Sequence, residues 1–517
     1  MAQAPQVAII ELGSQYTLVI ERTLRELGVR AVILDPKRAL PWLTAYKPKA
    51  VILSGGAASV YDKDAPQPPA EVLNLKNADG NPVAILGICY GMQWLAHRLG
   101  GKVEPIEGRR EYGETKLILT GELSLLFNET PQEQVVWASH GDSVTTVPPD
   151  FRVLATSLNN TPAAMANGNL IFGVQFHPEV THTENGKKIL ANFLALAGCK
   201  QDWQPNSVIT EIQGNVWKEL GGIDSGNKAI FGFSGGVDST TLGRMLGPML
   251  GPRLTGVVID GGHLREGELK EIHAHAEAAD VRLEVINVAK AFQTAMASVT
   301  DAEEKRKRFR IVYAATLMAA ARKFGAKFLL QGTLATDRIE SGATGGATIK
   351  THHNVGLEMR GLVQLHPLGH LFKHEVRALA RSLELPESVW NRQPFPGPGL
   401  FLRVVGTPAT TDKLEVVRWA DARVREITLR HGLYPRFAQL IVAYLGVNTV
   451  GVKGDGRVYG GSIVVRAVTT QDFMTARGVY LPEEVAREIS STLTSDPRIV
   501  RVFYDPTDKP PATTEME

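Results

Sequence analysis

One short stretch, VAILGICYGMQ at residues 83–93, decides how the first part of the chain is interpreted. Its apolar beginning predicts a buried strand, and its end predicts a helix. Between them, Gly87 and Gly91 flank Cys89 with the spacing of a nucleophile elbow, in which glycines permit a sharp turn that lifts a side chain above a sheet. The N-terminus of the following helix favours the thiolate form of a cysteine. We therefore predict that Cys89 is a nucleophile.

A base for this cysteine is expected in QFHPE at residues 175–179, which ends another apolar strand. If strand geometry persists there, His177 and Glu179 share one face, because residues i and i+2 do so, and the glutamate can orient the imidazole. Backbone amides near the strand ends can supply an oxyanion hole, for which the candidates are Gly56 and Tyr90. A lone cysteine or histidine is usually structural, but this combination favours catalysis.

A second chemical site is predicted in SGGVDS at residues 234–239, between a strand and a helix. A glycine-rich turn at that point exposes backbone N–H groups and places a helix N-terminus under an anion. The Gly-Lys-Ser/Thr ending of a Walker A loop is missing. Serine hydroxyls add donors, and Asp238 is a candidate Mg²⁺ ligand. The candidate phosphate-binding residues are Ser234, Gly235, Gly236, Val237, Asp238 and Ser239.

Short apolar strands alternate with helical patterns up to Cys199, and again from about Ser207. This alternation predicts an α/β protein with two successive parallel-sheet α/β domains, at residues 1–202 and 203–392, and a small C-terminal α+β domain at residues 393–517. The clearest expected elements are strands at Ala31–Leu34, Ala50–Leu53 and Leu254–Asp260 and helices at Ala302–Phe324 and Asp412–Arg430.

The composition excludes several classes of protein. Lys and Arg number 56 and Asp and Glu 54, so the net charge of +2 argues against a dedicated nucleic-acid-binding protein. The apolar runs are too short to span a membrane, and the N-terminus has no features of a secretory signal. Two cysteines in 517 residues exclude a disulfide framework, so a reducing cytoplasm is the expected setting.

The motifs around Cys89 and His177 resemble those of class I (triad) glutamine amidotransferases, which hydrolyse glutamine through a cysteinyl thioester and pass on ammonia. SGGVDS resembles the loop of ATP pyrophosphatases, which cleave ATP to AMP and pyrophosphate. In this order, and with further motifs to the end of the chain, they resemble the family of glutamine-hydrolysing GMP synthetases. The resemblance implies that ATP adenylates XMP and that ammonia then displaces AMP to give GMP. It also implies Mg²⁺ with ATP, no tightly bound organic cofactor, and a homodimer built by the C-terminal domain.

The same resemblance suggests site residues that no pattern in the sequence reveals. A lid over ATP and XMP is suggested for Lys350, His352 and His353, whose plain interpretation is a solvated basic loop. Contacts to XMP are suggested for Asp337, Glu340, Arg403, Lys509 and Glu515, with the cations on its phosphate. The basic run Lys305–Arg310 is interpreted as a solvated helix face, although the family makes a role with phosphate conceivable.

Two alternatives stay open at this point. Unusual residues beside Asp337, namely Ala335, Thr336 and Arg338, are compatible with a paralogue that adenylates and aminates a related substrate. A catalytically silent binding or regulatory protein on the same scaffold is the other alternative. The intact Cys89, His177, Glu179 and SGGVDS loop argue against it.

Overall fold

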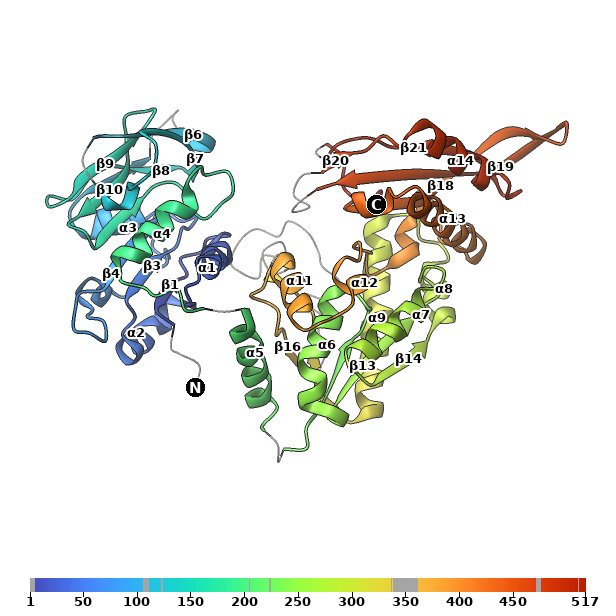
Figure 1. The fold of residues 1–517 in the computed structure, drawn as a ribbon, viewed down its shortest axis with the longest axis horizontal. Helices are drawn as coiled ribbons and strands as arrows, with labels where there is room; N and C mark the ends of the chain where they lie inside the picture. The colour runs from blue at the N-terminus through green and yellow to red at the C-terminus, as the bar shows by residue number, and fades with distance from the viewer. Residues whose placement is uncertain are drawn as a thin grey trace. The chain divides into compact units, whose positions relative to one another are not determined.

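The computed structural model of the chain describes residues 5–105, 111–121, 124–203, 205–222, 225–335, 337, 361–470, 476–509 and 511–517. Contacts between residues divide the chain into two compact units, drawn in Figure 1. The first is formed mainly by residues up to Glu211 and the second mainly by residues from Ile212 onward. Each unit is described by itself.

The first unit is built on one mixed sheet in the order β2-β1-β3-β4-β11-β10-β9-β6-β7. The neighbours among β2, β1, β3, β4 and β11 are parallel. The neighbours among β11, β10, β9, β6 and β7 are antiparallel. A separate antiparallel pair joins β5 and β8. The strands are β1 (Val7–Ile10), β2 (Ala31–Leu34), β3 (Ala50–Leu53), β4 (Ala84–Ile88), β5 (Lys102–Pro105), β6 (Glu111–Leu119), β7 (Glu133–His140), β8 (Asp142–Thr146), β9 (Arg152–Ser157), β10 (Pro162–Asn167) and β11 (Ile171–Val174).

Helices cover both faces of the parallel part of this sheet (Figure 1). Val7 and Ile9 pack on the face covered by α1 (Thr17–Glu26) and α4 (Gly186–Leu196). Ala8 and Ile10 pack on the opposite face, which α2 (Pro36–Tyr46) and α3 (Tyr90–Arg98) cover. A strand that is buried on both faces needs apolar side chains throughout, which explains its continuous apolar sequence.

The second unit contains α5 (Pro205–Glu219) from Ile212 onward and a parallel sheet in the order β14-β13-β12-β15-β16. The chain leaves β12 toward β13 on one side and later returns to β15 on the other, so the strand order reverses beside β12. Its strands and helices are β12 (Lys228–Gly232), α6 (Val237–Leu250), β13 (Leu254–Asp260), α7 (Glu268–Ala278), β14 (Leu283–Asn287), α8 (Ala289–Met296), α9 (Ala302–Phe324), β15 (Ala326–Leu330), β16 (Val363–Leu365), α11 (Lys373–Ser382) and α12 (Glu387–Trp390).

A long hairpin and two helices complete the second unit. Figure 1 shows β18 and β19 as one extended ribbon, with α13 packed against β18 and α14 against α13 and β21. The elements are β17 (Val404–Val405), α13 (Thr411–Arg430), β18 (Gln439–Lys453), β19 (Gly456–Thr469), β20 (Arg477–Gly478), α14 (Glu483–Thr494) and β21 (Ile499–Tyr504).

The predicted α/β class is confirmed, with one difference. The first sheet is parallel only over β2, β1, β3, β4 and β11. Short connections make β9, β10 and β11 antiparallel to one another, and β6 is antiparallel to both β9 and β7. In the second unit one continuous apolar cluster runs from Ile230 in β12 through Phe401 to Val417 in α13 and Ile463 in β19. A division of this unit at residue 393 therefore stays a prediction.

No helix in the part of the chain that the structure describes is long and apolar enough to cross a membrane.

Candidate functional site

Three neighbouring parallel strands bring the predicted nucleophile and base together. The strands β3, β4 and β11 end side by side, with Leu53 opposite Gly87 and Ile88 opposite Val174. A side-chain carbon placed on Gly55, just after β3, would lie 3.0 Å from Cε1 of His177 and 3.6 Å from Cβ of Cys89. The cysteine and the histidine thus share one small space at the carboxyl edge of the sheet, where ligands of such sheets bind.

The turn at Cys89 has the strained geometry of a nucleophile elbow. Cys89 has φ +51°, a conformation that residues other than glycine rarely adopt. A side-chain carbon on Gly87 would approach the carbonyl carbon of Gly91 to 2.5 Å, and one on Gly91 would approach the Leu53 oxygen to 2.4 Å. Both glycines are therefore required by close backbone packing. The Cys89 amide donates to the Val174 carbonyl, which ties the turn to β11.

His177 and Glu179 form a buried pair next to this turn. Nδ1 of His177 lies 2.8 Å from Oε1 of Glu179, and both side chains are almost inaccessible to solvent. Burial alone would lower the pKa of His177, but the Glu179 charge and a hydrogen bond with Cys89 together raise it well above its ordinary value. The pair thus favours an imidazolium beside the cysteine. Strand β11 ends at Val174, so the contact comes from the following turn and not from a shared strand face.

The two candidate oxyanion-hole residues are neighbours. A side-chain carbon on Gly56 would lie 3.4 Å from Cγ of Tyr90 and would collide with the Leu12 carbonyl. Tyr90 begins α3, and its hydroxyl donates to the Pro66 carbonyl. Their place beside Cys89 is compatible with the predicted role, which stays a prediction.

The second predicted site follows β12, where the strand order of the other sheet reverses. Gly235 has φ +66° and Gly236 caps the N-terminus of α6. The Ser234 and Ser239 hydroxyl oxygens lie 3.3 Å apart, and the Ser234 hydroxyl also accepts from the Gly236 amide. Nδ1 of His275 in α7 lies 2.8 Å from the Gly235 carbonyl oxygen, and this hydrogen bond holds the loop in place. The loop therefore presents backbone and hydroxyl donors at a helix N-terminus, as a phosphate site requires.

Asp238 lies in the first turn of α6, and its two carboxylate oxygens differ in their surroundings. Nζ of Lys373 lies 2.6 Å from Oδ2 of Asp238. Oδ1 is buried and has no hydrogen-bond partner among the described residues. A side-chain carbon on Gly332, after β15, would lie 3.4 Å from Cβ of Asp238, so the neighbouring strand end reaches the same place. Nothing in the sequence pattern indicated Lys373 as the partner of this carboxylate, because 135 residues separate them.

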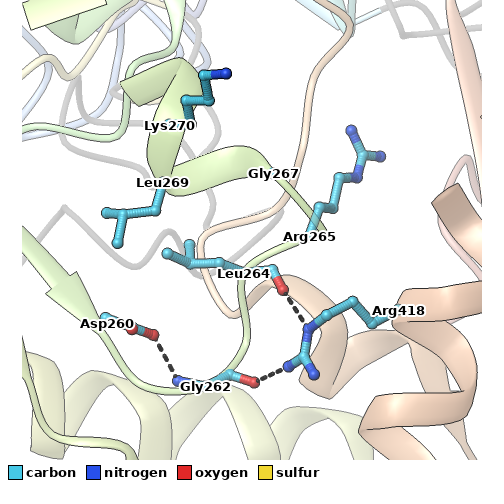
Figure 2. A pocket seen from close by; sticks show the side chains of 8 residues that line it. All are labelled: Asp260, Gly262, Leu264, Arg265, Gly267, Leu269, Lys270 and Arg418. Carbon is cyan, nitrogen blue, oxygen red and sulfur yellow. Dashed lines mark hydrogen bonds between the residues drawn. The ribbon is translucent and has the colours of Figure 1, made fainter. Parts of the chain in front are cut away.

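A cavity of about 260 Å³ opens at the carboxyl end of the adjacent strand β13. Figure 2 shows Arg418 of α13 donating to the carbonyls of Gly262 and Leu264, while Oδ1 of Asp260 accepts from the Gly262 amide. These contacts fix the loop after β13. The cavity therefore lies at the same edge of the sheet as the phosphate-type loop, but on the next strand.

The residues that the resemblance suggested for XMP and for the lid differ in where the structure places them. Arg403 is fully buried, with Nε 2.8 Å from Oε2 of Glu515, so the structure brings these two together. Lys509 pairs through its backbone with Ala476 in the same unit. Asp337 is half-buried and belongs to the other unit. The remaining predictions, Glu340, Lys350, His352 and His353, lie outside the described residues.

One sequence interpretation is wrong. Lys305, taken as part of a solvated face of α9, is fully buried, with Nζ 2.7 Å from Oε2 of Glu517. Phe309, four residues later on the same side of the helix, is buried as well. The run contains enough charge to suggest solvent exposure, but this side of the helix faces the core.

Comparisons with known proteins match the chain along its whole length. Family models match in order: Glutamine amidotransferase class-I at residues 8–197, NAD synthase at 209–397, and GMP synthase C terminal domain at 426–516. A GMP synthase (glutamine-hydrolyzing) of Thermus thermophilus is 44% identical over 99% of this chain and 100% of its own. The chain belongs to the glutamine-hydrolysing GMP synthase family. Proteins of the same name from Thermobifida fusca and Enterococcus faecalis are 43% and 40% identical, over 99% and 100% of this chain and 98% and 99% of theirs.

As a member of the GMP synthase family, the protein is a glutamine-hydrolysing, ATP-dependent ligase that converts XMP to GMP. The amidotransferase model covers Cys89, His177 and Glu179, and the NAD synthase model covers the SGGVDS loop. Neither the paralogue nor the silent scaffold is favoured by any of these matches.

Proposed function

We propose that the reaction is divided between two sites in separate units, with glutamine cleaved at Cys89 and XMP activated at the SGGVDS loop. The observation that carries this proposal is that Cys89, His177 and Glu179 lie in one unit, whereas the SGGVDS loop and the Asp238–Lys373 pair lie in the other. The division of the chain at residues 1–202, 203–392 and 393–517 is part of the same proposal.

In the first half-reaction, the Cys89 sulfur attacks the side-chain carbonyl carbon of glutamine. His177, held by Glu179, gives its proton to the departing nitrogen, so ammonia leaves and a thioester remains. Water then cleaves the thioester to glutamate and restores the thiol. Backbone donors near Gly56 and Tyr90 stabilise the oxyanion of each tetrahedral intermediate.

In the second half-reaction, the purine 2-oxygen of XMP attacks the α-phosphorus of ATP and pyrophosphate leaves. The Ser234 and Ser239 hydroxyls and the amides between them hold the departing phosphates. Ammonia then attacks C2 of the adenylated XMP, and AMP departs with the oxygen to leave GMP. Adenylation is needed because the carbonyl oxygen alone is a poor leaving group.

The Oδ1 oxygen of Asp238, which has no hydrogen-bond partner among the described residues, fits an Mg²⁺ ion bound together with ATP. A hard carboxylate oxygen that is buried without a partner among the described residues suits this cation. In the described ranges, no group of three or more acidic, His or Cys side chains is placed to hold a metal ion, and in this proposal phosphate oxygens of ATP and water would be the other ligands. Such an ion would neutralise negative charge on the pyrophosphate as it leaves.

For XMP itself, we propose contacts from Arg403, Lys509 and Glu515, with the cations facing its phosphate. Arg403 supports this because its buried Nη1 has no hydrogen-bond partner in the part of the chain that is described. Glu515 pairs with the same guanidinium and fixes its orientation. The roles of Asp337 and Glu340, and of Lys350, His352 and His353 in a lid, rest on the family resemblance alone.

Replacing Lys509 with alanine is expected to raise the KM for XMP by about 10- to 100-fold, because a hydrogen bond to a charged group contributes roughly 1.5–3 kcal/mol. The KM for ATP should change much less. Both constants are measured from AMP formation with ammonium as the nitrogen donor. An unchanged KM for XMP would remove Lys509 from the acceptor site.

We also propose a homodimer formed through the hairpin β18–β19. Apolar side chains stand exposed along it, including Val452 at 78% and Tyr459 at 70% of their full exposure, together with Val447 and Val450. Exposed apolar side chains that gather in one place mark protein contacts. Light scattering should give about twice the chain mass of 56.2 kDa, and a monomer at working concentration would contradict the proposal.

A cytoplasmic location stays a prediction, supported by two cysteines that are both free thiols.

A further inference from the structure

The segment from Asp505 to the last residue, Glu517, carries two of the proposed XMP contacts but has almost no regular structure of its own. Among its described residues, only a single bridge between Lys509 and Ala476 involves strand pairing. A segment without a backbone ladder keeps a fixed path only if side chains elsewhere hold it. The positions of Lys509 and Glu515 therefore depend on such contacts.

Arg466 in β19 supplies several of them. Its Nη1 lies 3.0 Å from Oδ2 of Asp505 and donates to the Thr507 carbonyl at 2.6 Å. Its Nη2 donates to the Thr513 carbonyl at 3.0 Å, and its Nε donates to the Thr514 carbonyl at 3.2 Å. One guanidinium thus binds the backbone on both sides of Lys509.

The burial of Arg466 shows how completely its donors are used. The side chain is 0% exposed, and a buried cation is tolerated only where charges and hydrogen bonds replace its lost hydration. A planar guanidinium carries five N–H donors in a fixed arrangement and can bind several acceptors at once. The ammonium of a lysine is a compact charge on one atom and cannot reach acceptors that lie so far apart. The sequence around this strand has no feature that indicates such a role.

Two further buried cations hold the end of the segment. Arg403 pairs with Glu515, and Lys305 of α9 pairs with Glu517. The other carboxylate oxygen of Glu517 accepts from the Gly406 amide at 2.7 Å. The segment is therefore held by Arg466 on both sides of Lys509 and, at Glu515 and Glu517, by cations from two other elements.

We propose that Arg466 is a positioning residue for the acceptor site, which holds the segment so that Lys509 and Glu515 face the nucleotide. The inference rests on the proposed contacts of these two residues with XMP. It assigns to Arg466 no contact with substrate. Its removal should therefore weaken XMP binding through displacement of the segment, and should leave the amidotransferase site unaffected.

The test compares Arg466→Lys with Arg501→Lys, a control on the neighbouring strand β21 where the side chain is exposed. Arg466→Lys keeps a positive charge near Asp505 but loses the arrangement of guanidinium donors that binds the backbone carbonyls of the segment. We expect the KM for XMP to rise about tenfold, since one to two charged hydrogen bonds are lost. The KM for ATP, the kcat with ammonium and the glutaminase activity should each stay within about threefold of the wild-type value. Arg501→Lys should change none of these.

Hydrogen exchange gives a second readout that does not depend on activity. Amides between Asp505 and Glu517 should exchange faster in Arg466→Lys than in wild type, and amides of β12 and β13 should not. If Arg466→Lys does not fold, Asp505→Asn removes only the charged partner, and the same changes should appear at about a third of the size. Asp505 is only half-buried, so this variant is expected to fold.

Three results would overturn the inference: an unchanged KM for XMP in the folded variant, equal rises in KM for XMP and ATP, or unchanged exchange in the segment. A different result separates the two proposals. If Arg466→Lys raises the KM for XMP but Lys509→Ala does not, Arg466 positions the segment and the proposed contact by Lys509 is wrong.

Discussion

Replacing Cys89 with alanine is expected to lower glutamine-dependent GMP formation by roughly a thousandfold or more, because removal of a catalytic nucleophile leaves no thioester route. Formation of GMP from added ammonium should stay within about twofold of the wild-type rate. The sulfur sits at a strained turn between Gly87 and Gly91, beside His177 and the Ser139 carbonyl, in the unit that does not contain the SGGVDS loop. Free ammonia needs none of them.

The matched control is Cys199→Ala. Burial raises the pKa of the Cys199 thiol to about 12, so it stays protonated and unreactive at neutral pH. This control should keep both activities. GMP formation is followed with glutamine and with ammonium chloride as alternative nitrogen donors. Equal losses with both donors in Cys89→Ala would contradict the assignment of two separate sites.

Replacing Asp238 with asparagine is expected to lower XMP-dependent pyrophosphate release by about 100- to 1,000-fold, because removal of one group that stabilises transition-state charge has effects of this size. The change removes the charge that we propose for Mg²⁺ and leaves Lys373 without its partner. Glutaminase activity should survive, since Asp238 belongs to the other unit.

A suitable control for this variant is Asp301→Asn. Asp301 is exposed and caps α9 by accepting from the Glu304 amide, a role that asparagine fills equally well. Both variants are assayed for pyrophosphate across a range of Mg²⁺ concentrations. Wild-type turnover by Asp238→Asn at low Mg²⁺ would rule out its role as a metal ligand.

Where the local sequence pattern is strong, the first and last residues of a strand or helix could be predicted correctly. The strands Ala31–Leu34, Ala50–Leu53 and Leu254–Asp260 are apolar runs with polar flanks. Helix α9 also matches its predicted bounds, because Asp301 caps its start and Gly325, with φ +66°, ends it. Local chemistry fixes both ends of these elements, so no tertiary information was needed.

Elements that depend on pairing were harder to predict. Strand β6 begins with mostly polar and charged residues and is apolar only over its last three, and it forms because β7 and β9 lie on either side of it. Of the long strand β19, the sequence indicated only Ser462–Ala467, which lies within the buried part, Gly461–Val468. The exposed remainder is held by its register with β18, and no local pattern encodes that register.

The site shows the same contrast. Cys89, His177 and the SGGVDS loop were identified because glycine spacing and strand ends mark them locally. The Glu179 contact was expected for the wrong reason, since the strand ends at Val174 and a turn brings the carboxylate to the imidazole. Lys373 and Arg466 act on partners far away in the chain, and a charged residue carries no local sign of such a partner.

The most direct measurement is pyrophosphate release from ATP without any nitrogen donor, in the presence of XMP, of IMP, or of neither. XMP should stimulate release, because its 2-oxygen accepts AMP before ammonia is needed. IMP has no oxygen at C2 and should leave the rate at the background level. Release with IMP, or none above background with XMP, would contradict adenylation of XMP at the SGGVDS loop.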